Sequence, residues 1–288
     1  MKTPFSINTF YTIDIGNSHT KIFSSTSSSL IKLISLEELN KKATPNDVII
    51  FSSVLSKKKC FALNPVLAKL LYSEILSTEI IYGKNFHPQI IDSAKYRIEN
   101  DYLGMKTSYG QTLGIDRLVQ ARLVFEELNH QKNSIKKCLL IDAGTMVTFD
   151  IVTVLDGHHG GIIAPGLKTY AICFAKGDQL PETQKILLRL ESYDSKNSLH
   201  IPNSTETAVT SSYWSSLLAY LSIFVQKWGI EKIVLTGGHG ELWLKQIKNS
   251  FELNEFSHLQ KCNFDLRPHF IHESLHWLGN KVLLGQVK

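Results

Sequence analysis

DIGNS, residues 14–18, ends an apolar run that begins at Phe10, and DAGTM, residues 142–146, ends a second apolar run that begins at Cys138. Each segment places an acid, a spacer, a glycine and a small polar residue at the end of a predicted strand. A glycine lets the backbone approach a phosphate closely, and the N–H groups of such a turn hydrogen-bond anionic oxygens. The acid suits a hard cation that holds the phosphates. One copy alone is typical of a strand-end turn, but the repeat predicts a two-lobed nucleotide-binding enzyme.

The composition is that of an ordinary globular protein, with 43% hydrophobic and 20% charged residues in a chain of 288. The net charge of +5 comes from scattered lysines rather than a basic stripe with interleaved aromatics, so we expect no nucleic-acid partner. Residues 213–225 form the longest lipophilic stretch, which falls short of the roughly 18 residues of a membrane span. Residues 1–12 lack the pattern of a secretory signal. We expect a cytoplasmic protein that binds no membrane.

Apolar runs alternate with amphipathic segments along the chain, which predicts an α/β fold. Strands are expected at residues 10–14, 20–24, 48–51, 79–82, 138–142, 147–154, 161–166 and 233–235. Helices are expected at residues 35–39, 61–77 and 206–228, and around residues 118–128. Residues 86–114 show no clear period and are interpreted as a long functional loop. The polar stretch 129–137 divides the chain into an N-terminal domain, 1–132, and a C-terminal domain, 133–288.

The cysteines and two adjacent histidines do not have metal-site spacing. The four cysteines lie far apart in the sequence and are expected to be buried free thiols. His158 and His159 stand in a glycine-rich connection without a third ligand at a suitable spacing, so we interpret both as facing solvent.

Four motifs in a fixed order resemble those of the type III pantothenate kinases, a family that also contains the Bvg accessory factors. They are Asp14 to Ser18 with Lys21, Gly114 to Arg117, Asp142 to Thr145 with Thr148 and Asp150, and Gly160 to Gly166. The resemblance implies the two-lobed actin-like fold of the acetate and sugar kinase superfamily, with duplicated ribonuclease H-like domains. It also implies ATP-dependent phosphorylation of pantothenate to 4'-phosphopantothenate, the first step of coenzyme A biosynthesis, by a homodimer.

The resemblance further implies a role for each matching residue. The ATP-binding residues would be Asp14, Ile15, Gly16, Asn17, Ser18, His19, Thr20, Lys21 and Thr145. The pantothenate-binding residues would be Tyr109, Gly114, Ile115, Asp116, Arg117 and Thr205. Asp142 corresponds to the ligand of a monovalent cation, K⁺ or NH₄⁺, and Mg²⁺ would accompany ATP.

Asp116 is the residue that we expect to accept the proton of the attacking hydroxyl. Phosphoryl transfer depends mainly on positioning and charge neutralisation, so a carboxylate near the hydroxyl completes the set of groups that the reaction needs. Arg117 presents a fork of donors that suits the pantothenate carboxylate. Taken without the other motifs, the same two residues would be typical of an ion pair at a helix start.

Three positions depart from the family pattern. Residues 106–113 lack the Asn-Pro pair and place Tyr109 closer to Gly114 than in many members, while Met146 and Ser212 replace smaller residues. Two alternatives therefore stay open. One is a catalytically weak or inactive regulatory protein of the Bvg accessory factor type, because fold does not fix function. The other is a phosphatase, or a kinase for a different hydroxy acid.

Overall fold

The computed structural model describes residues 9–16, 19–26, 29–44, 47–72, 89–110, 112–130, 135–174, 182–197 and 200–286. The chain forms two compact units. Unit 1 comprises residues 1–104, 110–123 and 269–288, and unit 2 comprises residues 105–109 and 124–268. The units therefore differ from the predicted division at residues 132 and 133. The C-terminal helix returns to unit 1, and helix α5 (Ile115–His130) contributes residues to both units.

Unit 1 contains a five-stranded sheet in the order β3-β2-β1-β4-β5. Its strands are β1 (Phe10–Ile15), β2 (Thr20–Thr26), β3 (Ser29–Ile34), β4 (Val48–Ser53) and β5 (Gln89–Asp92). Strands β1, β2 and β3 pair antiparallel, while β4 and β5 continue the sheet parallel to β1. The apolar runs at residues 10–14, 20–24 and 48–51 therefore form strands as predicted, and residues 79–82 lie outside the described part of the chain.

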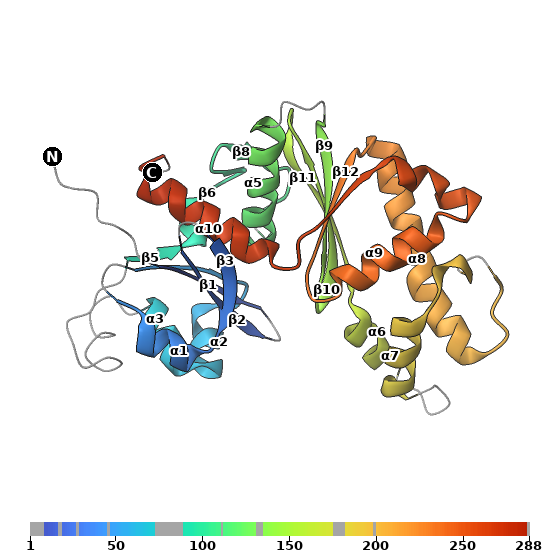
Figure 1. Cartoon of the computed structure of the whole chain (residues 1–288), viewed down its shortest axis with the longest axis horizontal. Helices are drawn as coiled ribbons and strands as arrows, with labels where there is room; N and C mark the ends of the chain where they lie inside the picture. The colour runs from blue at the N-terminus through green and yellow to red at the C-terminus, as the bar shows by residue number, and fades with distance from the viewer. Residues whose placement is uncertain are drawn as a thin grey trace. The chain divides into compact units, whose positions relative to one another are not determined.

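Helices pack on both faces of this sheet because side chains alternate along each strand. Residues Tyr11, Ile13 and Ile15 share a core with α1 (Leu36–Lys42), α2 (Lys57–Leu63) and α3 (Pro65–Tyr72). Phe10 and Thr12 point to the opposite face, where they contact α10 (Phe270–Leu283). Figure 1 shows α10 crossing β1 on this face.

Unit 2 contains a second five-stranded sheet, in the order β11-β10-β9-β12-β13. Its strands are β9 (Lys137–Ala143), β10 (Met146–Thr153), β11 (Gly157–Pro165), β12 (Lys232–Thr236) and β13 (Asn263–Leu266). When the strands are counted within their own unit, both sheets have the order 3-2-1-4-5. The repeated topology confirms the predicted fold class, in which an α/β ribonuclease H-like domain is duplicated as in actin-like kinases.

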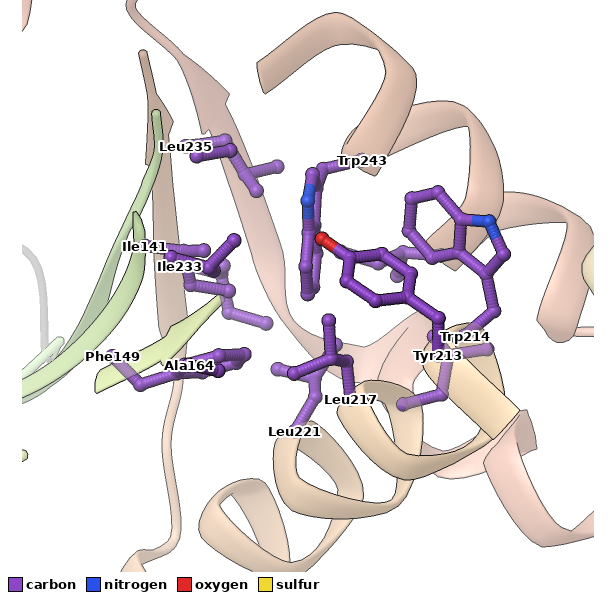
Figure 2. Packing of buried hydrophobic residues seen from close by; sticks show 14 of the residues in the cluster. Ile141, Phe149, Ala164, Tyr213, Trp214, Leu217, Leu221, Ile233, Leu235 and Trp243 are labelled. Atoms are coloured by element: carbon purple, nitrogen blue, oxygen red, sulfur yellow. The ribbon is translucent and has the colours of Figure 1, made fainter. Parts of the chain in front are cut away.

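The core of unit 2 lies between this sheet and a layer of helices (Figure 1). The helices of unit 2, apart from the end of α5, are α6 (Leu167–Phe174), α7 (Thr183–Ser192), α8 (Thr205–Trp228) and α9 (Gly240–Ser250), with short 3₁₀ turns η2 (Ser195–Asn197) and η3 (Asn254–Lys261). Figure 2 shows Tyr213, Trp214 and Leu217 of α8 packed with Trp243 of α9 above Phe149 of the sheet. Burial of such aromatic surface supplies much of the stability of the unit.

Helix α8 is the one helix in the described part of the chain that is long and apolar enough to cross a membrane. Its mean hydropathy is 1.2 over the most apolar 18-residue window, and 44% of that window is buried. The helix is longer than the lipophilic stretch that the sequence pattern indicated. Its buried face belongs to the core of unit 2, which is the usual position of such a helix in a folded domain.

Two sequence predictions about secondary structure were wrong. The helix predicted over residues 61–77 is two helices, because Pro65 starts a new helix and disfavours helical backbone at Asn64. The side chain of Asn64 instead accepts a hydrogen bond from Leu67 N at 3.1 Å. The supposed loop over residues 86–114 contains β5, the 3₁₀ turn η1 (Ser93–Tyr96) and a three-stranded sheet of β6 (Arg97–Ile98), β7 (Asp101–Tyr102) and β8 (Met105–Lys106).

The cysteine prediction holds for three of the four residues. Cys60, Cys138 and Cys262 are buried free thiols, whereas Cys173 is exposed. Burial raises the pKa of the Cys138 thiol to about 12 and that of Cys262 to about 11. These buried thiols are therefore protonated at neutral pH and are poor nucleophiles.

Candidate active site

The first phosphate turn follows β1 in unit 1. Gly16 N donates a hydrogen bond to His19 O at 3.0 Å, and a Cβ on Gly16 would lie 3.3 Å from the same oxygen. His19, Thr20 and Lys21 are exposed, while Asn17 and Ser18 lie outside the described residues. Asp14 is the second-last residue of β1, directly before the turn. The turn thus presents a carboxylate, a hydroxyl and a cationic side chain within eight residues.

A cavity of about 200 Å³ adjoins this turn. It is lined by Ile15, Gly16, His19 and Thr20, together with mostly apolar residues of the α2–α3 region. A larger cavity of about 340 Å³ lies along α9 and contains none of the predicted site residues. The smaller cavity is therefore the relevant one, because predicted phosphate-binding residues line it.

The second group in unit 1 is at the start of α5. Ile115 and Asp116 are the first two residues of this helix, where a carboxylate is favoured by the helix dipole. A Cβ on Gly114 would overlap the Asp116 carboxylate, so a side chain at position 114 would displace the carboxylate. Arg117 is 6% exposed. Little of the Arg117 side chain reaches the surface. The contact of Arg117 with pantothenate stays a prediction.

Arg97 holds the segment that leads into this helix, and sequence reasoning missed it. Its Nη1 donates to Leu113 O at 2.9 Å, and its Nη2 donates to Gly110 O at 2.6 Å. The guanidinium thus joins the two ends of the turn directly before Gly114. No sequence signal identifies this role, because Arg97 is part of a two-residue strand without measurable periodicity.

The second turn follows β9 in unit 2 and is packed against bare glycine backbone. A Cβ on Gly166 would overlap the carbonyl oxygen of Gly144 and lie 2.7 Å from that of Thr145. Gly166 N also donates to Thr145 O at 3.0 Å, and Thr169 Oγ1 donates to the same oxygen at 2.7 Å. The side chain of Thr145 is exposed. The Pro-Gly pair that ends β11 thus fixes the backbone that carries Thr145.

Asp142 lies beside a third glycine turn. A Cβ on Gly237 would lie 2.5 Å from Asp142 Oδ1, and Gly237 has a φ of +85°. His239 N donates to Ala143 O at 3.0 Å and joins this turn to the end of β9. The Asp142 carboxylate therefore lies against the Gly237 backbone. A carboxylate oxygen suits a hard monovalent cation better than a soft metal.

Thr205 is exposed and is the first residue of α8. Ser204 is the N-cap, and it forms a capping box with Thr207. The side chain of Glu206 pairs with Arg189 of α7, whose Nε lies 2.6 Å from Oε2. The start of α8 is therefore well ordered, and it leaves the Thr205 hydroxyl accessible.

The interpretation of His158 as a solvent-facing residue was wrong. His158 and Asp150 are both 0% exposed, and His158 Nε2 lies 2.7 Å from Asp150 Oδ1. His159 is a partly buried residue at a bulge in β11, with its Nε2 3.2 Å from Thr153 Oγ1. The glycines on both sides suggested an open loop, but they instead allow close packing of the strand against other backbone.

A buried histidine lies beneath the hairpin that carries the first phosphate turn. His272 of α10 has its Nδ1 2.9 Å from Thr12 Oγ1, and its ring centroid is 4.1 Å from that of Phe23. Burial, with a smaller contribution from the Lys21 charge, lowers the pKa of His272 to about 3. The imidazole is therefore neutral at physiological pH.

Comparison with known proteins gives one consistent family. Residues 10–226 match the family model of type III pantothenate kinase. The type III pantothenate kinase of Flavobacterium johnsoniae is 26% identical over 252 residues, covering 84% of this chain and 91% of that protein. That of Pelagibacter ubique is 27% identical over 252 residues, covering 84% and 92%. Among solved structures, acetate kinase of Porphyromonas gingivalis is 9% identical with a TM-score of 0.43, covering 94% of this chain and 99% of that one.

Proposed function

Because this chain belongs to the type III pantothenate kinase family, we propose that it transfers the γ-phosphoryl group of ATP to the 4'-hydroxyl of pantothenate. The products are 4'-phosphopantothenate and ADP. The observation that carries the proposal is the duplicated turn. Asp14 and Asp142 are each the second-last residue of the first strand in two sheets with the same order. This is the arrangement expected of a phosphotransferase that binds a nucleotide through both halves of its chain.

Each predicted residue has a defined task in this reaction. The turn from Asp14 to Lys21 binds the ATP phosphates, with its N–H groups and the Lys21 charge neutralising their oxygens. Thr145 contacts the nucleotide from the second turn. Asp116 accepts the proton of the 4'-hydroxyl of pantothenate. At the same time the hydroxyl oxygen forms a bond to the γ-phosphorus, and the bond between the γ-phosphorus and the ADP oxygen breaks. The carboxylate suits this task because it stands in the first turn of a helix, two residues after Gly114.

Pantothenate is held by residues from three segments in this proposal. Gly114, Ile115 and Arg117 flank the proton acceptor, Tyr109 precedes them, and Thr205 contributes an exposed hydroxyl. The Arg117 guanidinium is the donor that suits the pantothenate carboxylate. Its burial favours a pairing in low-dielectric surroundings, where a charged hydrogen bond is strong.

Two cations complete the proposed chemistry. Mg²⁺ binds the ATP phosphates and neutralises their charge, and Asp14 is the carboxylate next to them. K⁺ or NH₄⁺ is held by Asp142, whose carboxylate lies against the backbone of Gly237. A cation there supplies positive charge next to the turn that carries Thr145.

The remaining family expectations are part of the same proposal. We propose a cytoplasmic homodimer that binds no nucleic acid and no membrane. The exposed apolar residues Tyr220 and Ile223 of α8, 46% and 53% accessible, support a protein contact along this helix.

A mass-spectrometric assay tests the function directly. The purified protein is incubated with ATP, Mg²⁺ and pantothenate, in K⁺ or in Na⁺, and the pantothenate pool is analysed for addition of one phosphoryl group. We expect conversion in K⁺ that matches the ADP released. ADP release without phosphorylated pantothenate, but with a phosphorylated alternative hydroxy acid, would assign a different substrate. No turnover with any monovalent cation would instead favour a binding protein on this scaffold.

A further inference from the structure

Unit 2 contains a buried hydrogen-bond chain that runs from the sheet to the proposed pantothenate-binding tyrosine. The Asp150 carboxylate pairs with His158 Nε2 at 2.7 Å, and His158 Nδ1 lies 3.0 Å from Thr107 Oγ1. Tyr109 N then donates to Thr107 Oγ1 at 3.2 Å. The three side chains are at most 3% exposed. A buried carboxylate of β10 is thus linked to a backbone amide in the substrate segment.

One protonation state satisfies each group in this chain. Tyr109 N–H donates to Thr107 Oγ1, and the Thr107 hydroxyl donates to an unprotonated His158 Nδ1. The remaining ring proton on Nε2 then points to the Asp150 carboxylate, which fixes the tautomer. All donors follow one direction, an arrangement in which neighbouring hydrogen bonds strengthen each other.

Backbone contacts hold the same segment against β11. Thr107 forms a parallel bridge with His158, and Ser108 N donates to His158 O at 2.9 Å. A Cβ on Gly157 would overlap the Lys106 carbonyl oxygen, and Gly157 has a φ of +76°. The close approach of these two strands therefore requires glycine at this position.

The tyrosine ring is also placed by a glycine. Gly160 has a φ of +94°, and a Cβ on it would lie 2.9 Å from Tyr109 Cδ2. The ring of Tyr109 thus rests on bare backbone next to the hydrogen-bond chain. Both the amide and the ring of this residue are held by the segment 157–160.

We propose that Asp150, His158 and Thr107 are positioning residues that set the place of Tyr109 for pantothenate. The inference rests on the proposed function, because it assigns the positioned tyrosine to that substrate. The three residues do not touch the reacting atoms. They act by fixing a short segment, the exposed Ser108 and the half-buried Tyr109, to a rigid strand, which lowers the cost of ordering it when substrate binds.

Thr107→Val tests this role because it removes the hydroxyl and preserves the shape of the side chain. We expect the KM for pantothenate to rise about tenfold, since a buried hydrogen-bond pair is broken, while the KM for ATP stays within about twofold. Thr107→Ser restores the hydroxyl and should return the KM for pantothenate to nearly the wild-type value. An unchanged KM for pantothenate in Thr107→Val would overturn the proposal.

Thr153→Val is a matched control in the same unit. Thr153 is 5% exposed, and its hydroxyl contacts His159 and Asp156 rather than the Tyr109 segment. The control thus loses a threonine hydroxyl that is about as buried as that of Thr107 and that contacts His159, the residue after His158. We expect no change in either KM. If Thr107→Val and Thr153→Val both raise the KM for pantothenate and the KM for ATP to the same extent, the cause is a general loss of stability and the positioning role is rejected.

A double-mutant cycle and an amide-exchange measurement separate positioning from folding. If Thr107 acts through Tyr109, then Thr107→Val adds no further rise in the KM for pantothenate to Tyr109→Ala. Additive effects would contradict the proposal. Hydrogen exchange at the Tyr109 amide needs no substrate and should become about tenfold faster in Thr107→Val only. If the Tyr109 amide exchanges as slowly in Thr107→Val as in the wild type, the positioning role of the hydrogen-bond chain is rejected. Failure of the wild type to phosphorylate pantothenate counts against the proposed function alone.

Discussion

Asp142 and Gly237 are so closely packed that a Cβ on the glycine would lie 2.5 Å from the carboxylate oxygen Oδ1. Gly237 also has a φ of +85°, which disfavours any residue with a side chain. The turn after β12 therefore fixes the carboxylate at the end of β9, although these residues are almost a hundred positions apart. The proposed cation site depends on this contact.

Gly237→Ala should impair the response to monovalent cations. The added methyl group displaces the Asp142 carboxylate, so the K⁺ concentration for half-maximal activity is expected to rise severalfold. The left-handed backbone adds a loss of about 1–3 kcal/mol in the free energy of unfolding. Activity as a function of K⁺ concentration and urea denaturation measure the two effects separately.

Gly285→Ala is the control for this substitution. Gly285 has a φ of +67°, but no described atom lies within 4 Å of the position that a Cβ would take. The control thus carries the backbone cost without a side-chain displacement, and its K⁺ response should equal that of the wild type. If both variants respond to K⁺ alike, Asp142 is not the cation ligand.

Asp116→Asn should lower kcat by about 10²–10⁴-fold, because the amide cannot accept the proton of the attacking hydroxyl. The KM for ATP should change little, since Asp116 is not part of the phosphate turn. Steady-state kinetics with circular dichroism as a folding check provide the measurement. Asp101→Asn is the control, because its side-chain oxygen accepts a hydrogen bond from Gly104 N at 2.8 Å and an amide oxygen can replace it. Full turnover in Asp116→Asn would assign the proton to another acceptor.

The sheets were predictable because their central strands are continuous apolar runs. Two of these strands are buried on both faces of their sheets, namely Val48 to Phe51 and Cys138 to Ile141. An unbroken run of apolar residues indicates such a strand without any further information. The two-residue strands β6, β7 and β8 are too short to produce a period, so the same reasoning yielded a loop. Helix α3 was merged with α2 because the apolar pattern continues across Pro65.

The site residues were predictable where a motif carries the chemistry within a few positions. The turns at Asp14 and Asp142 and the helix start at Asp116 are of this kind. Arg97 and His158 were missed because their partners are distant in the sequence. Thr107 lies 51 positions from His158, and only the isolated bridge between these two residues reveals that the histidine is buried rather than exposed.

Arg97→Lys should weaken the hold on the turn before Gly114. A lysine ammonium cannot bridge two carbonyl oxygens with the fixed geometry of a guanidinium. We expect the KM for pantothenate to rise about tenfold, as for loss of one hydrogen bond to a charged group, with the KM for ATP preserved. Arg267→Lys is the control, because Arg267 forms an ion pair with Glu127 that a lysine ammonium can also form. An unaltered KM for pantothenate in Arg97→Lys would separate this turn from substrate binding.

His272 should make the stability of the protein depend on pH. In the unfolded chain its imidazole takes up a proton near pH 6.5, whereas the folded protein keeps it neutral down to about pH 3. Between these values the unfolded state binds more protons, so the free energy of unfolding falls as the pH falls. From the pKa of about 3, the loss attributable to this residue is about 2 kcal/mol at pH 5.

Urea denaturation from pH 7.5 to 4.5 tests this contribution with His272→Gln, which removes the titrating group and keeps a polar side chain beside Thr12. The variant is expected to lose stability at pH 7.5 but to show a flatter pH dependence than the wild type. Some slope should remain, because burial also lowers the pKa of His276 on the same helix. His200→Gln is the control, since His200 is exposed and its removal should leave the slope unchanged. Equal slopes in His272→Gln and the wild type would show that folding does not lower the pKa of His272, so that its imidazole takes up a proton in the folded protein at the same pH as in the unfolded chain.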